Sequence, residues 1–99
     1  MANEIRVEKE GSAERGRYVA RIDGVEGEAE MTCKQGGPGV SVVNHTYAPP
    51  HMRGTGAARA LLARLLVDAR AEGFRIVPSC SWVRDQFARH PEWRDLLAE

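Results

Sequence analysis

Hydrophobic and polar residues alternate along the first half of the chain, which is the pattern of β-strands with one buried face. Strands are predicted on this basis over residues 4–9, 17–23, 25–34 and 39–47. The first of these alternates weakly and suits an edge strand, whereas the third alternates most clearly. The fourth is rich in β-branched residues and suits a central strand, with a bulge expected where Val42 and Val43 break the alternation.

The second half of the chain changes to a helical period. Apolar residues recur three and four positions apart between residues 54 and 72, which predicts one long helix, and Gly73 is placed to end it. A short strand is expected over residues 74–78, then a second helix from residues 79–81 to about His90, and a last turn over residues 91–97. The order β-β-β-β-α-β-α predicts an α+β fold with a mixed sheet, in which the strands flanking the long helix are parallel.

Composition narrows the functions that are open to this chain. Its 99 residues predict a single domain over residues 1–99, and its 14 basic residues balance its 14 acidic ones. Zero net charge argues against binding to nucleic acid, and no apolar run approaches the roughly 20 residues that span a bilayer. We therefore expect a cytoplasmic protein that contacts neither membrane nor nucleic acid. No cysteine and histidine cluster has the spacing of a metal site.

A glycine-containing loop joins the fourth predicted strand to the long helix. The first turn of a helix carries unpaired N–H groups and a partial positive charge, and glycines let a phosphate approach the backbone closely. Residues 53–57, Arg-Gly-Thr-Gly-Ala, are therefore a candidate pyrophosphate cradle, to which Arg53 would add charge, while His51 is either a second phosphate contact or simply exposed. No lysine follows Gly56, so the loop is not a P-loop, and Arg59 occupies the third glycine position of a dinucleotide-binding fingerprint.

These features together resemble the GNAT superfamily of N-acetyltransferases, in particular its compact members of about this length. The GNAT signature, [Gln/Arg]-x-x-Gly-x-[Gly/Ala], corresponds to residues 51–56, with His51 in place of glutamine or arginine. That departure puts one side-chain contact in doubt. The resemblance extends to Pro78-Ser-Cys-Ser-Trp-Val and to His90-Pro-Glu-Trp, and it covers about residues 15–95.

The resemblance implies a compact GNAT-like sheet whose two parallel strands splay apart, with acetyl-CoA as cosubstrate. Its pantetheine arm would lie along the end of strand 39–47 and bind the main chain near Tyr47 and Ala48, with the thioester beside Cys80. The cofactor-binding residues implied are Tyr47, Ala48, His51, Met52, Arg53, Gly54, Thr55, Gly56 and Ala57. The acceptor would be an amine-bearing small molecule or peptide, and the protein a monomer or weak dimer.

Two residues are candidates for catalysis. Many GNAT enzymes protonate the departing CoA thiolate with a tyrosine, whose nearest equivalent here is Phe87, which has no hydroxyl. Cys80 precedes a helix, where thiol pKa values fall, and it is either an acyl-accepting nucleophile, an acid, or a packed small residue. His45 is either a base, a residue that orients Cys80, or a structural histidine.

Other residues have more than one interpretation. Cys33 faces the core side of its strand, and Trp82 and Trp93 suit packing, although Trp82 is near enough to Cys80 to line a pocket. An acidic stripe of Glu26, Glu28 and Glu30 is either a solvated face or an attraction for a cationic amine.

The chain has no helical segment between its first two strands of the kind that walls the acceptor site in larger GNAT enzymes. An open acceptor site is therefore expected. The alternative to an enzyme is a non-catalytic acyl-CoA-binding regulatory module. Phe87, which stands in place of an acid, supports this alternative, and Cys80, beside the expected thioester, argues against it.

Overall fold

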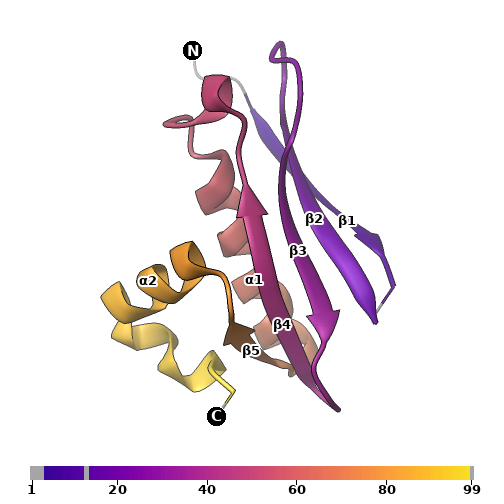
Figure 1. Cartoon of the computed structure of the whole chain (residues 1–99), viewed down its shortest axis with the longest axis vertical. Helices are drawn as coiled ribbons and strands as arrows, with labels where there is room; N and C mark the ends of the chain where they lie inside the picture. Colours follow the sequence, from indigo (N-terminus) through magenta and orange to yellow (C-terminus); the bar gives the residue numbers. More distant parts are fainter. Residues whose placement is uncertain (1–3, 13, 99) are drawn as a thin grey trace.

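The computed structural model of this protein describes residues 4–12 and 14–98, which form one five-stranded sheet with two α-helices (Figure 1). The strands follow the order of the chain across the sheet. They are β1 (Ile5–Gly11), β2 (Arg15–Ile22), β3 (Ala29–Gln35), β4 (Val40–Tyr47) and β5 (Arg75–Pro78). The helices are α1 (Ala57–Glu72) and α2 (Ser81–Arg89), with 3-10 turns η1 (Pro50–Met52) and η2 (Pro91–Leu96). The predicted α+β class and element order are confirmed.

The sheet is antiparallel from β1 to β4 and parallel between β4 and β5, as the two strands on either side of α1 were expected to be. The far edge of β5 is covered in part by the end of the chain. Leu97 forms a parallel bridge with Ile76, whose carbonyl accepts a hydrogen bond from the N–H of Ala98 at 2.8 Å. None of the described helices is long and apolar enough to cross a membrane.

Two element boundaries differ from the prediction because glycines adopt positive φ, and the bulge in β4 also lies at a different residue. β3 begins at Ala29 and not at residue 25, since Gly24 (φ 81°) and Gly27 (φ 90°) hold the preceding segment in a turn. α1 begins at Ala57 and not at residue 54, because Gly54 and Gly56 also have positive φ. The bulge in β4 lies at Asn44, one residue beyond the two valines, since Thr32 pairs with His45 and Cys33 with Val43.

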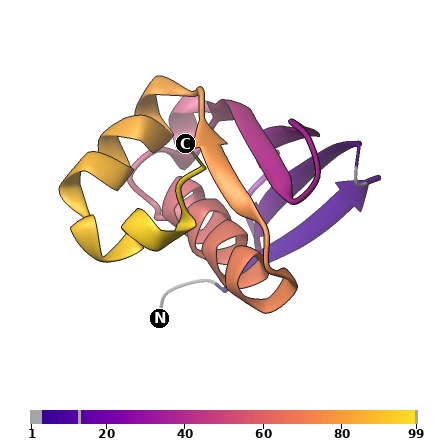
Figure 2. The ribbon, with the colours of Figure 1, turned by 90° about the horizontal axis from the view of Figure 1, so that it is seen from below.

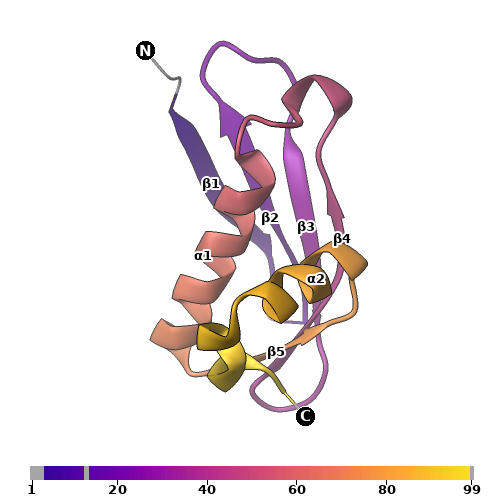
Figure 3. The same ribbon diagram turned by 90° about the vertical axis from the view of Figure 1, so that its left-hand side faces the viewer.

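All the described helices pack on one face of the sheet (Figures 2 and 3). α1 crosses β1, β2 and β3, and α2 contacts β4 and β5. The apolar stripe of α1 supplies Leu61 and Leu65, which are fully buried against the inward residues of the strands, such as Met31 and Val43. The predicted helical period therefore identified the core face of α1.

The other face of the sheet is covered by ion pairs in place of helices. Arg17 contacts Glu10, Glu28 and Glu30 at 2.8–3.0 Å. Arg21 contacts Glu8 and Glu28 at 2.7 and 2.9 Å. Val19, between these arginines on β2, is 0% exposed although it lies outside the main core cluster. The charged side chains thus shield an apolar residue, and two of the three glutamates in the acidic stripe are neutralised by arginine.

A buried polar contact ties α1 to the sheet. Asp68 on α1 is 8% exposed and accepts a hydrogen bond from the Tyr18 hydroxyl of β2 at 2.8 Å. Arg64 donates to the same carboxylate at 3.1 Å and to the carbonyl of Val7 on β1 at 3.1 Å. Burial and the hydrogen bond to Asp68 raise the pKa of Tyr18, so its hydroxyl stays protonated and donating.

We expect Tyr18→Phe to lower the free energy of unfolding by about 1–2 kcal/mol, because it leaves one buried carboxylate oxygen of Asp68 without its donor. Tyr47→Phe is the matched control, since Tyr47 is 43% exposed and its loss should stay within about 0.5 kcal/mol. Urea denaturation followed by circular dichroism measures both. Equal stability of the two variants would contradict the anchoring role of Tyr18.

Candidate functional site

The site begins where β4 and β5 part. Their parallel pairing ends at Val43 and Pro78, while β4 continues to Tyr47. One further link follows, from the N–H of Cys80 to the carbonyl of Val43 at 3.0 Å, and then α2 begins. The edge of β4 after Val43 that faces β5 therefore has no strand partner among the described residues, and its backbone groups can bind something else.

The glycine loop lies beyond the end of this edge. Gly54 (φ 81°) and Gly56 (φ 93°) turn the chain into α1, and a Cβ placed on Gly54 would have no atom within 4 Å. Thr55 fixes the turn, because its hydroxyl donates to the Met52 carbonyl and accepts from the N–H of Ala57 at 3.3 Å. The next two N–H groups of the helix have no intrahelical acceptor, as in the first turn of any helix.

A hollow of about 510 Å³ lies in front of this loop. It is lined by Ala48, Met52, Arg53, Gly54, Thr55, Gly56, Ala57, Ala58, Arg59 and Trp82. Seven of these residues are among the nine cofactor-binding residues that the sequence nominated. The helix supplies Ala58 and Arg59 as well, at the second and third positions of its first turn. Two arginines thus border a concave surface at the positive end of a helix.

Arg53, His51 and Met52 differ in where their side chains go. The guanidinium of Arg53 donates to the carbonyl of Ala48 at 3.1 Å, which holds it at the rim of the hollow. The ring of His51 turns away, with Nε2 2.6 Å from the carbonyl of Glu26 in the turn before β3. Met52 is 1% exposed and belongs to the core, so its side chain is structural, although it forms part of the wall.

Cys80 is the N-cap of α2, and its Sγ lies 3.5 Å from the hydroxyl of Thr46. Partial burial raises the pKa of this thiol. The neighbouring backbone N–H groups of Val83 and Trp82 and the hydroxyl of Thr46 lower it, and the net pKa lies below its ordinary value. The site therefore stabilises a thiolate at the point where β4 and β5 part.

The thiol of Cys33 differs from that of Cys80 in the direction of its pKa shift. It packs against the core on β3, as expected, and burial raises the pKa of its thiol above the ordinary value.

His45 and Tyr47 lie on the face of β4 that none of the described helices covers. His45 pairs with Thr32, whereas Thr46 pairs with Met31 on the core side. The rings of His45 and Tyr47 are stacked, with centroids 6.3 Å apart. The structure therefore places Thr46, not His45, beside the sulfur of Cys80. Thr46 was missed by the sequence analysis, although its position one residue before Tyr47 on the inward face could have indicated it.

The C-terminal aromatic residues form a packing cluster. Phe87 is buried and its ring meets that of Trp93 edge to face at a centroid distance of 5.6 Å. The ring of His90 stacks on Trp93 at 4.1 Å, and His90 Nδ1 lies 3.0 Å from a carboxylate oxygen of Glu92. Phe87 therefore fills the core and supplies no acid, and Trp82 is the aromatic residue of this region that lines the hollow.

Comparison with known proteins gives a family match and a fold match. Residues 17–96 match the family model described as GCN5-related N-acetyl-transferase. The fold is similar to the NMR solution structure of a GCN5-like protein from Staphylococcus aureus, with a TM-score of 0.66. That alignment covers 98% of this chain and 89% of the other at 20% sequence identity, so it supports the fold alone.

The thiols of Cys80 and Cys33 should react with iodoacetamide over different pH ranges. A lowered pKa gives more thiolate at a given pH, so Cys80 should be alkylated at lower pH than Cys33, whose pKa is raised. Thr46→Val should shift the profile of Cys80 to higher pH, while Thr32→Val, on the other face, should leave it unchanged. Mass spectrometry of the modified peptides across a pH series gives both profiles. Coincident profiles for the two cysteines would contradict this assignment.

Proposed function

This chain belongs to the family of GCN5-related N-acetyl-transferases, and we propose that it transfers an acetyl group from acetyl-CoA to an amine. The observation that carries the proposal is the hollow in front of the glycine loop at the start of α1, together with the edge of β4 that has no strand partner and leads toward that loop. A cosubstrate with an amide-bearing arm and a pyrophosphate needs a site for each of these two parts.

The glycine loop fits a pyrophosphate on three grounds. Free N–H groups and the helix dipole attract an anion, and Arg53 and Arg59 add two positive charges at the rim. The space in front of Gly54 is open, so phosphate oxygens can approach the backbone. The N–H groups of Gly56, Ala58 and Arg59 would bind the phosphates, because those of Thr55 and Ala57 already donate to the Met52 carbonyl and the Thr55 hydroxyl. The side chain of His51 would not bind them, because it is held by Glu26.

The unpaired edge of β4 fits the pantetheine arm. That arm contains amide groups, which can pair with the backbone of β4 as a further strand would. Residues up to Tyr47 and Ala48 would bind it through their main chain, as the sequence resemblance implies, and the thioester would then lie near Cys80.

Cys80 is suited to accept the acetyl group, because its surroundings stabilise a thiolate. The thiolate attacks the thioester carbonyl, the bond from that carbon to the CoA sulfur breaks, and CoA leaves as a thiolate. An amine then attacks the acetylated cysteine, the carbon–sulfur bond to Cys80 breaks, and the amine loses one proton. Protonation of the departing CoA by the Cys80 thiol is the second role that this position allows, in which the amine attacks acetyl-CoA directly.

His45 is suited to take the proton from the amine. Its ring is exposed on the uncovered face of β4, on the opposite side of the strand from Cys80. An acceptor that approaches from this face would meet His45 before it reaches the thioester.

A second function, binding of acyl-CoA without turnover, is favoured by one observation. Phe87, which stands where many enzymes of this family have a tyrosine acid, is buried and packed on Trp93. The experiments below separate the two functions.

We expect Gly54→Glu to weaken acetyl-CoA binding by at least about tenfold, because it places bulk and negative charge where the phosphates would bind. Gly39→Glu is the matched control, since Gly39 also has positive φ and open space around it but lies in the turn before β4. Calorimetric titration of both variants, with circular dichroism to verify the fold, makes the comparison. Wild-type affinity in folded Gly54→Glu would refute the assignment of the loop.

Cys80→Ala should retain acetyl-CoA affinity but lose acetyl transfer to a panel of primary amines and peptides by about a hundredfold or more. Release of free CoA measures transfer, and intact mass measures acetylation of the protein. If the wild-type protein becomes acetylated and the Cys80→Ala variant does not, Cys80 is a nucleophile. If the variant loses transfer although the wild-type protein is never acetylated, Cys80 is an acid. Full transfer by Cys80→Ala would show that Cys80 is only a packing residue, and binding without transfer by the wild type would indicate the non-catalytic function.

A further inference from the structure

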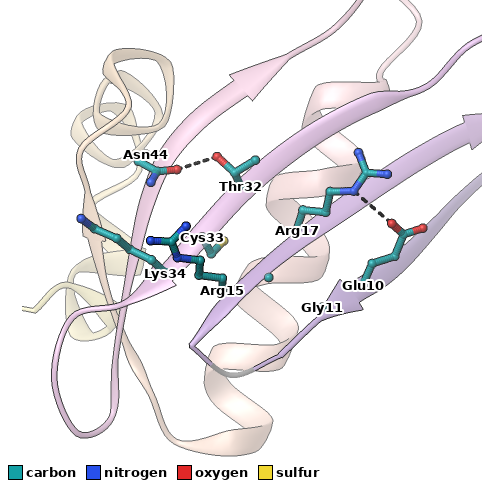
Figure 4. Close-up of a pocket in the computed structure, with 9 residues that line it drawn as sticks. Glu10, Gly11, Arg15, Arg17, Thr32, Cys33, Lys34 and Asn44 are labelled. Carbon is teal, nitrogen blue, oxygen red and sulfur yellow. Dashed lines mark hydrogen bonds and ion pairs between the residues drawn. The ribbon is translucent and has the colours of Figure 1, made fainter.

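A second hollow, of about 610 Å³, lies on the face of the sheet that no helix covers (Figure 4). Strands β1, β2, β3 and β4 all contribute to it. Its polar lining consists of Glu10, Arg15, Arg17, Thr32, Lys34 and Asn44. The glycine loop lies elsewhere, at the start of α1, so this hollow is distinct from the one proposed for the cosubstrate.

Two of its cations lack partners. Arg17 and Glu10 pair with each other at 3.0 Å at one end of the hollow. At the other end Arg15 and Lys34 are exposed, and in residues 4–12 and 14–98 neither has a carboxylate within 4.0 Å. The hollow therefore has an excess of two positive charges.

The position of these two cations is unfavourable for the empty protein. Arg15 and Lys34 are direct cross-strand partners in the register of β2 and β3, and like charges in that arrangement repel. Elsewhere on this face Arg17 and Arg21 are each placed against glutamates. An anion between Arg15 and Lys34 would remove the repulsion and satisfy both side chains.

The hollow also reaches the strand that carries the reaction site. Asn44, the bulge residue of β4, lines it and accepts a hydrogen bond through Oδ1 from the hydroxyl of Thr32 at 2.5 Å, which leaves the amide N–H groups of Asn44 as donors. Asn44 follows Val43, whose carbonyl binds the N–H of Cys80. One wall of the hollow is therefore formed by the residues of β4 next to the point where β4 and β5 separate, on the face of the sheet opposite Cys80.

We propose that this hollow selects acceptors that carry an acidic group as well as the amine, with the acidic group bound by Arg15 and Lys34. The inference rests on the proposed acetyl transfer. Lys34 pairs with Val42, two residues before Asn44, which is about 7 Å along the strand. An acceptor whose acidic group lies beside Lys34 and whose amine reaches at least the level of Asn44 must hold the two groups about 7 Å or more apart. Short peptides with an acidic second or third residue have this spacing, whereas the amine and carboxylate of one α-carbon do not.

Matched tripeptide amides test the proposal. Ala-Ala-Glu amide and Ala-Ala-Gln amide differ only in charge, and Ala-Ala-phosphoserine amide distinguishes a carboxylate site from a phosphate site. We expect kcat/KM for the Glu peptide to exceed that for the Gln peptide by about fivefold, the effect of two partly exposed ion pairs, and the preference to shrink with added salt.

The double variant Arg15→Gln/Lys34→Gln should lose this preference and keep the activity on the Gln peptide. Its thermal stability should be unchanged or higher, because a repulsive pair is removed. Arg6→Gln is the control, since it removes one positive charge from β1 of the same sheet and Arg6 pairs with Asp23 outside the hollow. It should keep the preference.

NMR titration separates failure of this inference from failure of the proposed function. Saturable shifts of the amide signals of Arg15, Lys34 and Asn44 with the Glu or phosphoserine peptide, absent with the Gln peptide and in the double variant, would support the site even in a protein without turnover. Equal kcat/KM for the Glu and Gln peptides, or no shifts at these three residues, would overturn it while leaving acetyl transfer to neutral amines intact.

Discussion

The described helices cover only one face of the sheet, and this imbalance determines the character of the rest of the molecule. The covered face provides the single apolar core, in which α1 packs on the inward residues of β1, β2 and β3. The uncovered face must be polar toward solvent yet still protect Val19. Arginines bridging rows of glutamates meet both requirements, because their aliphatic stems cover the apolar residue while their charges stay solvated and paired.

Because β4 and β5 separate after Val43, the end of β4 can be reached from both faces of the sheet. On the side of the helices, Thr46 and Cys80 meet where α2 begins. On the uncovered side, Asn44 and His45 project from the same strand. The bulge at Asn44 contributes to this arrangement, since an extra residue changes which side chains point outward. A donor bound on one side and an acceptor bound on the other could therefore meet through the open edge of β4.

Periodicity predicted the strands, the helices, their order and the core face of α1, because each of these depends on local sequence alone. Turn geometry was harder to predict: the alternation over residues 25–34 continues through Gly27, whose positive φ is invisible to a binary pattern. The parallel pairing of the strands around α1 was predicted, but individual side-chain contacts between distant segments were not. The hydrogen bond from His51 to the turn before β3, and the contact of Thr46 with Cys80, depend on the register of the sheet.

Several residues with a proposed function adopt local structures that are unfavourable for folding. Gly54 and Gly56 hold left-handed conformations that cost backbone entropy, the end of β4 forgoes a strand partner, and Arg15 faces Lys34 across a strand pair. Each arrangement is unfavourable for folding, and under the proposed function each would become favourable when a particular ligand group binds: a phosphate, an amide-bearing arm or an acid. The anchor between Tyr18 and Asp68 lies away from all three and secures α1 without restricting them. Stability and binding are thus assigned to different residues of one small domain.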